Sequence, residues 1–238
     1  MYANRDLDGT LTGDLASLPA AAIFDMDGVL VDSNPFHLRK WAELLRDRNI
    51  PYDAADLPLQ ILGKRNDHAF RLFFGADMSQ EKMRRLGEEL EEHFRRAFRP
   101  HARPLPGLEA LLRRLRGAGI PMAVASSAMR SNVEFIVDAL QFRPFFRSVI
   151  SGDDVRSPKP DPEIYLKSAE ALGVKPEACV AFEDSFVGIE AVKAARMKCV
   201  AIASTFPIDG LRSQTSADLA VTDFTELSLE VLRQLFDP

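Results

Sequence analysis

The chain has 238 residues, 46% of them hydrophobic, and a formal net charge of −5 at pH 7. This length permits one large domain or two smaller ones with a buried core, and the negative charge excludes a general attraction to nucleic acid or to an anionic membrane. No apolar stretch approaches the roughly 20 residues that cross a bilayer, and residues 1–19 show no secretory signal. We therefore expect a cytoplasmic protein with neither nucleic-acid nor membrane partners. We also expect a monomer.

Residues 1–19 are predicted to form a flexible tail. They contain Asp6-Leu7-Asp8-Gly9, a pattern that returns at Asp25-Met26-Asp27-Gly28. Only the second copy follows an apolar run, residues 20–24, that can form a buried strand. Because a motif is informative only in its structural context, we interpret the first copy as a decoy.

The second copy predicts chemistry at the end of the first strand. Strand side chains alternate, so Asp25 and Asp27 face the same side, and Gly28 lets the backbone turn away. Two neighbouring carboxylates are costly unless a cation lies between them or one holds a proton. Such a pair suits Mg²⁺, and an aspartate can also accept a phosphoryl group as a nucleophile. A solvated Asp-Gly turn is the alternative interpretation.

No convincing strand follows in residues 35–104, where the pattern is helical. One helix is predicted from Phe36 to about residue 49, a second over 67–74 and a third over 79–98. The third carries an apolar stripe at spacings of three and four residues, which indicates core packing. We predict that 35–104 form a helical cap domain whose turn-rich borders suit a hinged lid over the strand ends.

Strands and helices alternate in the rest of the chain. The expected strands are 20–24, 122–126, 148–151, 178–182, 199–202 and 218–221, and the expected helices are 108–117, 130–140, 162–172 and 188–196. This alternation predicts an α/β fold with a doubly wound, mostly parallel, Rossmann-like sheet, formed by residues 20–34 and 105–238. Ligands of such sheets bind beyond the carboxyl ends of the strands.

Three further polar motifs follow predicted strands. Ser126 and Ser127 offer a hydroxyl and backbone N–H groups that could hold a phosphate or cap a helix. Lys159, between two prolines, could neutralise a phosphate, or it could be a surface lysine. Glu183 and Asp184 form a second acid pair suited to a metal, and Asp184 could also cap the next helix. Side chains that could bind a ligand or take part in catalysis thus follow four of the predicted strands.

In this order and spacing the motifs resemble those of the haloacid dehalogenase-like hydrolase superfamily, in the subgroup with a helical cap after the first strand. The matching segments are Asp25-Met26-Asp27-Gly28-Val29, Val124-Ala125-Ser126, Lys159, and Glu183-Asp184-Ser185 with Gly188. The resemblance covers nearly the whole chain from residue 20. Dehalogenation in this superfamily uses the first aspartate without an acid two residues later, so Asp27 favours phosphate-ester chemistry.

The resemblance also implies roles for these residues. Asp25 would attack phosphorus and become an aspartyl phosphate, while Asp27 would protonate the leaving oxygen and then activate water. Ser126 and Lys159 would hold the phosphoryl oxygens, assisted by the backbone N–H groups of Met26 and Ser127. The implied Mg²⁺ ligands are Asp25, the backbone carbonyl of Asp27, and Asp184, with Glu183 in or near the coordination shell.

The closer resemblance is to sugar-phosphate phosphatases and beta-phosphoglucomutases, through residues 32–37 and Trp41. It places His37 near Asp27, although an exposed helix histidine is equally compatible with the sequence. The mutases have an arginine three residues after the cap-loop glycine, whereas Lys64 and Arg65 follow Gly63 here, and both become candidate substrate contacts with Ser127. We expect an Mg²⁺-dependent phosphatase acting on a small phosphorylated metabolite such as a sugar phosphate. A beta-phosphoglucomutase and a catalytically idle binding protein are the alternatives.

Overall fold

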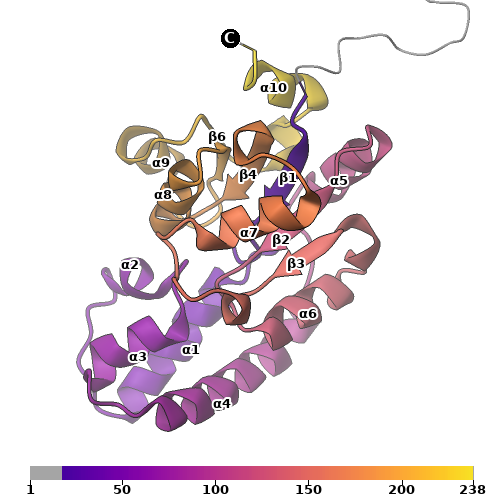
Figure 1. Ribbon diagram of the computed structural model, residues 1–238. Coiled ribbons are helices and arrows are strands. Elements are labelled where there is room, and N and C mark those ends of the chain that lie inside the picture. Colours follow the sequence, from indigo (N-terminus) through magenta and orange to yellow (C-terminus); the bar gives the residue numbers. More distant parts are fainter. Residues whose placement is uncertain (1–17, 238) are drawn as a thin grey trace, which may run out of the picture.

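The computed structural model describes residues 18–237, so the decoy at residues 6–9 lies outside the described part. A six-stranded sheet forms the centre, ordered β3-β2-β1-β4-β5-β6, and all neighbouring strands are parallel (Figure 1). Its strands are β1 (Ala21–Phe24), β2 (Met122–Ala125), β3 (Ser148–Ile150), β4 (Cys179–Glu183), β5 (Lys198–Ile202) and β6 (Leu219–Val221). The predicted doubly wound parallel sheet is confirmed, and each strand end lies within one residue of its expected position.

Helices cover both faces of the sheet. They are α5 (Leu108–Gly117), α6 (Arg130–Ala139), α7 (Glu163–Leu172), α8 (Phe186–Ala194), α9 (Ile208–Gln214) and α10 (Leu229–Gln234). Within β1, Ala22 and Phe24 pack with α5, α6 and α10, whereas Ala21 and Ile23 pack with α7, α8 and α9. Both faces of β1 are therefore apolar, as in parallel sheets with helices on each side.

Four helices between β1 and β2 form a second body below the sheet (Figure 1). They are α1 (Asn34–Asp47), α2 (Leu57–Ile61), α3 (Asn66–Phe74) and α4 (Gln80–Phe98). A hydrophobic cluster of their own includes Trp41, Leu45 and Phe70. This is the helical insertion expected after the first strand. The exact domain borders stay a prediction.

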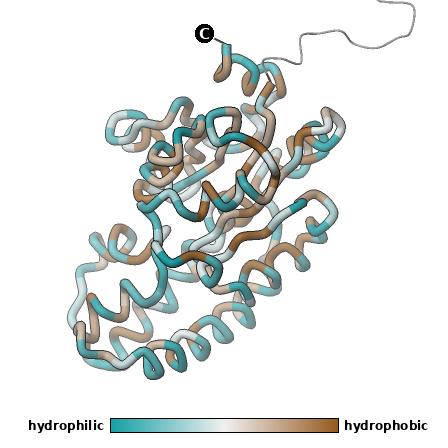
Figure 2. The backbone as a smooth tube through the Cα atoms, viewed as in Figure 1, coloured by the Kyte–Doolittle hydropathy of each residue, from teal (hydrophilic) through white to brown (hydrophobic). Residues whose placement is uncertain are grey.

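The long helix α4 contributes to both bodies. Met83, Leu86 and Leu90 belong to the cap cluster, while Phe94 and Phe98 pack in the core cluster around β1. Most other residues of α4 are hydrophilic, and hydrophobic residues gather in the sheet above it (Figure 2). The apolar stripe thus joins the cap to the core.

Three helices were not expected from the sequence, namely α2, α9 and α10, with 5, 7 and 6 residues. Segments of this length hold fewer than two turns, so their apolar period is not visible. The helix expected over 188–196 begins earlier, at Phe186, because the Ser185 hydroxyl accepts a hydrogen bond from the Gly188 N–H and caps it. Ser185 therefore has the capping role that we considered for Asp184. Within residues 18–237, no helix is long and apolar enough to span a membrane.

Candidate active site

The loop after β1 is folded so that Asp25 and Asp27 lie at the carboxyl edge of the sheet. The N–H of Asp25 still donates to the Phe182 carbonyl of β4 at 3.0 Å, which extends the ladder by one bond. Gly28 then has a φ of +77°, and a Cβ there would lie 1.9 Å from Oδ2 of Asp184. Only glycine allows both the turn and this close approach.

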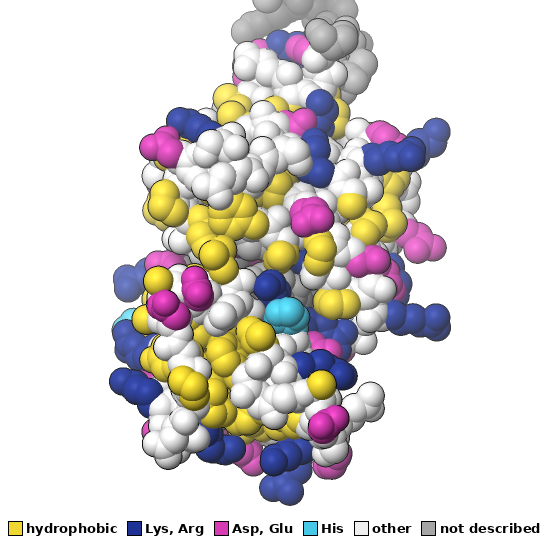
Figure 3. Space-filling model, turned by 90° about the vertical axis from the view of Figure 1, so that its left-hand side faces the viewer, with side chains coloured by type: hydrophobic (Ala, Val, Ile, Leu, Met, Phe, Trp, Pro, Cys, Tyr) yellow, Lys and Arg dark blue, Asp and Glu magenta, His cyan; other side chains and the backbone are white. Residues whose placement is uncertain are grey.

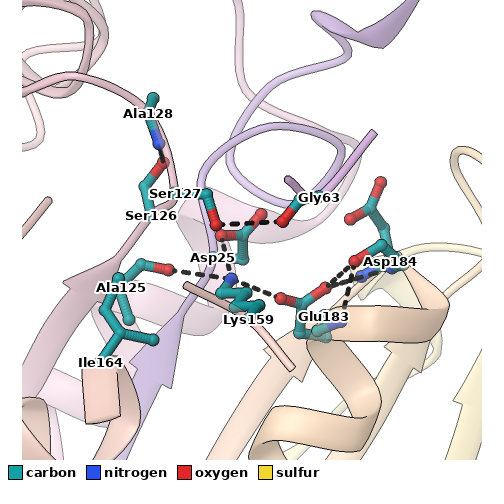
Figure 4. Close-up of polar contacts among 12 residues, drawn as sticks. Asp25, Gly63, Ala125, Ser126, Ser127, Ala128, Lys159, Ile164, Glu183 and Asp184 are labelled. Carbon is teal, nitrogen blue, oxygen red and sulfur yellow. Dashed lines mark hydrogen bonds and ion pairs between the residues drawn. The ribbon is translucent and has the colours of Figure 1, made fainter. Parts of the chain in front are cut away.

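Lys159 joins the acid groups of two strands. Its Nζ donates to Oδ1 of Asp25 at 2.8 Å and to Oε1 of Glu183 at 2.6 Å, and its side chain is only 1% exposed (Figure 4). The Tyr165 hydroxyl from α7 donates to the same Glu183 oxygen at 2.8 Å. The alternative of a surface lysine is wrong, because the ammonium group lies buried among carboxylates.

The second acid pair ends β4 and begins the turn into α8. Oε2 of Glu183 accepts from the N–H groups of Asp184 and Ser185, at 2.9 and 3.1 Å, and from the Ser185 hydroxyl at 3.0 Å. Asp184 instead receives hydrogen bonds from Asn34 and Thr205. The two adjacent acids therefore have different environments: Glu183 is held by Lys159 and its own turn, and Asp184 by distant segments.

Asp25, Glu183 and Asp184 form a buried acidic cluster that could bind a metal ion. One oxygen of each lies within 4.8 Å of the others. Burial raises the pKa of Asp25 to about 8, with Glu183 adding to the effect of burial and Lys159 opposing it. Burial, followed by Glu183 and Asp25, also raises the pKa of Asp184 well above its usual range. When all three carboxylates are ionised, one ammonium leaves an uncompensated negative charge, and hard oxygen ligands suit Mg²⁺, so the residues fit a divalent cation.

Asp27 lies beside this cluster and is held by residues at the start of the cap. Nε2 of His37 lies 3.1 Å from Oδ1 of Asp27, and the Ser33 hydroxyl donates to the same oxygen at 2.5 Å. The imidazole stacks on Phe94 with 4.0 Å between ring centroids. Burial opposes ionisation of Asp27, but His37 and Ser33 more than offset it and lower its pKa. The structure thus places His37 against Asp27 and not on an exposed face.

The two serines after β2 lie at the same edge. Ser126 is 1% exposed, and its hydroxyl oxygen accepts from the Ala128 N–H at 3.1 Å. Its own proton has no acceptor among residues 18–237, so it can donate to a ligand. The Ser127 hydroxyl donates to the Gly63 carbonyl of the cap at 3.0 Å. Both serines line the same cavity as Asp25.

Comparison with known families identifies this arrangement. The family model of the haloacid dehalogenase-like hydrolases matches residues 19–196 of the chain. The chain belongs to the haloacid dehalogenase-like hydrolase family.

Relatives within this family carry several names. The chain is 32% identical over 217 residues to the chloroplastic 5-amino-6-(5-phospho-D-ribitylamino)uracil phosphatase of Arabidopsis thaliana, covering 91% of the chain but only 57% of that relative. It is 32% identical to the phosphorylated carbohydrates phosphatase of Thermotoga maritima, covering 74% of this chain and 81% of that one. It is 30% identical to the beta-phosphoglucomutase of Bacillus subtilis, covering 90% and 94% of the two chains.

Solved structures of the haloacid dehalogenase-like family share the fold. The crystal structure of a family IA, variant 3 hydrolase from Entamoeba histolytica superposes with a TM-score of 0.82 at 26% identity, covering 91% of this chain and 98% of that one. The predicted α/β core with a helical cap is thus an architecture found elsewhere in the family.

The cavity of this family member lies between the core and the cap. Its volume is about 760 Å³, and Asp25, Asp27, Ser126 and Ser127 are among the lining residues on the core side. Cap residues from α1, α3 and α4 line the opposite side. Figure 3 shows the indentation between the two bodies, with basic and histidine side chains near its floor. A ligand here would contact both bodies.

Lys64 and Arg65, the two cap residues predicted to contact the substrate, both donate hydrogen bonds to backbone carbonyls of the protein. Nζ of Lys64 donates to the Leu59 carbonyl at 2.9 Å. The Arg65 guanidinium donates to the carbonyls of Gly152 and Val155, at 3.2 and 3.3 Å, and so links the cap to the loop after β3. Both residues line the cavity, and Arg65 also connects the two bodies.

A buried polar cluster around Glu91 was missed by sequence reasoning. The Glu91 carboxylate accepts from Lys40 at 2.7 Å, from Asn66 at 2.6 Å and from Asn132 of the core helix α6 at 2.6 Å. Nζ of Lys40 also lies 3.3 Å from Nδ1 of His37, which connects this cluster to Asp27. A single glutamate within the charged pattern of α4 gives no sequence signal of burial.

Glu91→Gln is expected to lower the free energy of unfolding by about 3 kcal/mol at pH 7, because Lys40 would remain buried without its counter-charge. Burial alone would raise the pKa of Glu91, but Lys40, His37 and Asn66 offset it and lower the pKa from 4.5 to about 2. A lowered pKa contributes stability that is present above the unfolded pKa and is lost as pH falls. The difference in free energy of unfolding between the wild type and Glu91→Gln should therefore stay constant above about pH 5 and shrink below it, as measured by urea denaturation.

Glu88→Gln is the matched control, because Glu88 pairs with Arg84 on the exposed face of the same helix. This variant should change stability by less than about 1 kcal/mol. Equal losses in the two variants would contradict a specific role for the Glu91 ion pair.

Proposed function

We propose that this protein is an Mg²⁺-dependent phosphatase that hydrolyses a small phosphorylated metabolite, in particular a sugar phosphate, through an aspartyl phosphate on Asp25. The observation that carries the proposal is the Asp25–Lys159 pair, which lies beside Glu183 and Asp184 at the edge of the cavity. The phosphatase names of two relatives support it, and the phosphorylated carbohydrates phosphatase supports the substrate class. A cytoplasmic location and a monomeric state stay predictions.

Asp25 is the proposed nucleophile for attack on phosphorus. Lys159 binds Oδ1, so Oδ2 of the same carboxylate is left to form the new bond to phosphorus. The Ser126 hydroxyl lines the cavity, and it would bind the transferring phosphoryl oxygens together with the Lys159 ammonium beside Asp25. Mg²⁺, when held by Asp25, Asp184 and the Asp27 carbonyl with Glu183 nearby, would supply positive charge that screens the repulsion between carboxylate and phosphate.

Asp27 would serve both halves of the reaction. As the ester P–O bond breaks, Asp27 gives its proton to the leaving oxygen; it then takes a proton from the water that attacks the phosphorus of the intermediate. His37 and Ser33 hold its ionised form, which is the form required for the second half. The negative phosphate of a bound substrate would raise the pKa of Asp27 and favour the protonated form needed first.

The alternative is a beta-phosphoglucomutase, in which a sugar hydroxyl and not water takes the phosphoryl group, as the Bacillus subtilis relative suggests. Two observations favour the phosphatase: the position three residues after Gly63 is Asn66 and not arginine, and Nη1 of Arg65 is bound to core carbonyls. With Mg²⁺, beta-glucose 1-phosphate and a trace of the bisphosphate, we expect free phosphate. Formation of glucose 6-phosphate, measured with a coupled dehydrogenase, would establish the mutase instead.

A broader substrate screen distinguishes a phosphatase or a mutase from a catalytically idle binding protein. A panel of sugar and polyol monophosphates, with para-nitrophenyl phosphate as a generic substrate, should release phosphate only when Mg²⁺ is present. No release from any member, despite measurable Mg²⁺ binding, would support the binding protein.

A further inference from the structure

The carboxylate of Asp184 is held by side chains from two distant segments. Nδ2 of Asn34 donates to Oδ2 of Asp184 at 2.8 Å and to Oγ1 of Thr205 at 2.6 Å. The Thr205 hydroxyl, after β5, then donates to the same Asp184 oxygen. Both N–H bonds of the amide are used, and both converge on one carboxylate oxygen.

Burial makes this arrangement specific. Asn34 is 5% exposed and Asp184 is 2% exposed, so neither can exchange its partner for bulk water. The Cβ that any other residue would add at Gly28 would lie 2.7 Å from Nδ2 of Asn34, so the loop after β1 leaves space for this contact. Both hydrogen bonds that Asp184 accepts from Asn34 and Thr205 go to Oδ2, and its Oδ1 has no hydrogen-bond partner among the described residues.

Asn34 also occupies a particular place in the fold. It is the first residue of α1, the helix that begins the cap, and it is separated from Asp184 by 150 positions. A single side chain therefore connects the root of the cap to the acidic cluster of the core. Within the described part of the chain, no other cap side chain donates to Asp25, Glu183 or Asp184.

We propose that Asn34 is a positioning residue for the divalent cation. It immobilises Oδ2 of Asp184, with Thr205, and so directs the remaining oxygen towards Asp25 and Glu183, where the cation would bind. This inference rests on the metal-dependent function proposed above. It goes beyond that function because it assigns cation affinity to a residue of the cap helix that would not touch the metal.

The test is Mg²⁺ binding measured by titration calorimetry on the full chain, without substrate. Asn34→Ala should raise the Kd for Mg²⁺ by about 10- to 100-fold, which is the usual effect of removing a group that orients a metal ligand. Thr205→Val, which keeps the side-chain shape but loses the hydroxyl, should also raise it. Asn132→Ala is the matched control, because Asn132 is a buried asparagine at the same boundary and bonds Glu91 but not Asp184.

A second measurement separates positioning from general damage to the fold. The turnover of para-nitrophenyl phosphate by Asn34→Ala should recover when the Mg²⁺ concentration is raised in proportion to the new Kd, whereas a distorted site would not respond. An unchanged Kd in Asn34→Ala, or an equal rise in Asn132→Ala, would overturn the inference while leaving the phosphatase intact. Failure of the wild-type protein to bind Mg²⁺ would overturn both.

Discussion

Asp25→Asn is expected to lower the rate of Mg²⁺-dependent phosphate release by about 10⁴-fold or more, the scale of loss when a covalent nucleophile is removed. An amide oxygen in place of Oδ2 cannot form the acyl phosphate. Lys159 would still have Glu183 as a partner at 2.6 Å, so the variant keeps the side-chain shape and one of the two buried ion pairs. Phosphate release from para-nitrophenyl phosphate is the direct measurement.

The fold of this variant should survive for an electrostatic reason. The pKa of Asp25 is raised to about 8, so without metal the folded state favours its protonated form. A raised carboxyl pKa means that stability is full below the unfolded pKa, near 4, and falls as pH rises towards 8. A neutral asparagine removes this loss. Without Mg²⁺ at pH 8, urea denaturation should show Asp25→Asn to be at least as stable as the wild type.

Asp27→Asn is the matched control, since it makes the same chemical change two residues away. Para-nitrophenolate leaves without a proton, so this variant should still form the phosphorylated enzyme but hydrolyse it slowly. Intact-protein mass spectrometry should detect the added phosphoryl group in Asp27→Asn and not in Asp25→Asn. Full turnover by Asp25→Asn, or a phosphorylated form of it, would reject the assignment of the nucleophile.

The part of the site that could be predicted is the part encoded at the strand ends. Asp25 and Glu183 lie at the ends of buried apolar strands, and Lys159 lies in the segment after β3. In a parallel sheet the carboxyl ends of neighbouring strands meet at one edge. Local pattern and topology together therefore brought these residues to one place. The same reasoning could not tell that Lys159 lies between Asp25 and Glu183, because the loop path after β3 sets that position.

The contacts that were missed depend on how segments far apart in the sequence pack together, within the cap and between the cap and the core. Asn34 and Thr205 are 171 positions apart, and Lys40 and Glu91 are 51 apart on two cap helices. Each of these residues has an ordinary local explanation: a helix start, a loop hydroxyl, or a charge on a polar face. Nothing in a local pattern indicates which polar side chains become buried when helices or bodies pack together, so these networks emerge only from the three-dimensional arrangement.

Lys159→Met is expected to lower the free energy of unfolding by about 5 kcal/mol at pH 7 without Mg²⁺, because it leaves the buried Glu183 carboxylate without its cation. Burial alone would lower the pKa of Lys159, but Asp25 and Glu183 more than offset it and raise the pKa. In return, Lys159 outweighs burial at Glu183 and lowers the pKa of that carboxyl. Turnover should be lost as well, since the same ammonium group orients the nucleophile.

The pH dependence identifies the cause of this loss. The stability that comes from the lowered pKa of Glu183 is present above its unfolded pKa, about 4.3, and disappears at lower pH. The difference in free energy of unfolding between the wild type and Lys159→Met should therefore become smaller from pH 7 to pH 4, as measured by urea denaturation. Mg²⁺ should stabilise the variant more than the wild type. Lys167→Met, which removes a half-exposed lysine paired with Glu163, should cost less than about 1 kcal/mol at either pH. A gap that is the same at both pH values would mean that lost packing, and not the uncompensated charge of Glu183, destabilises the variant.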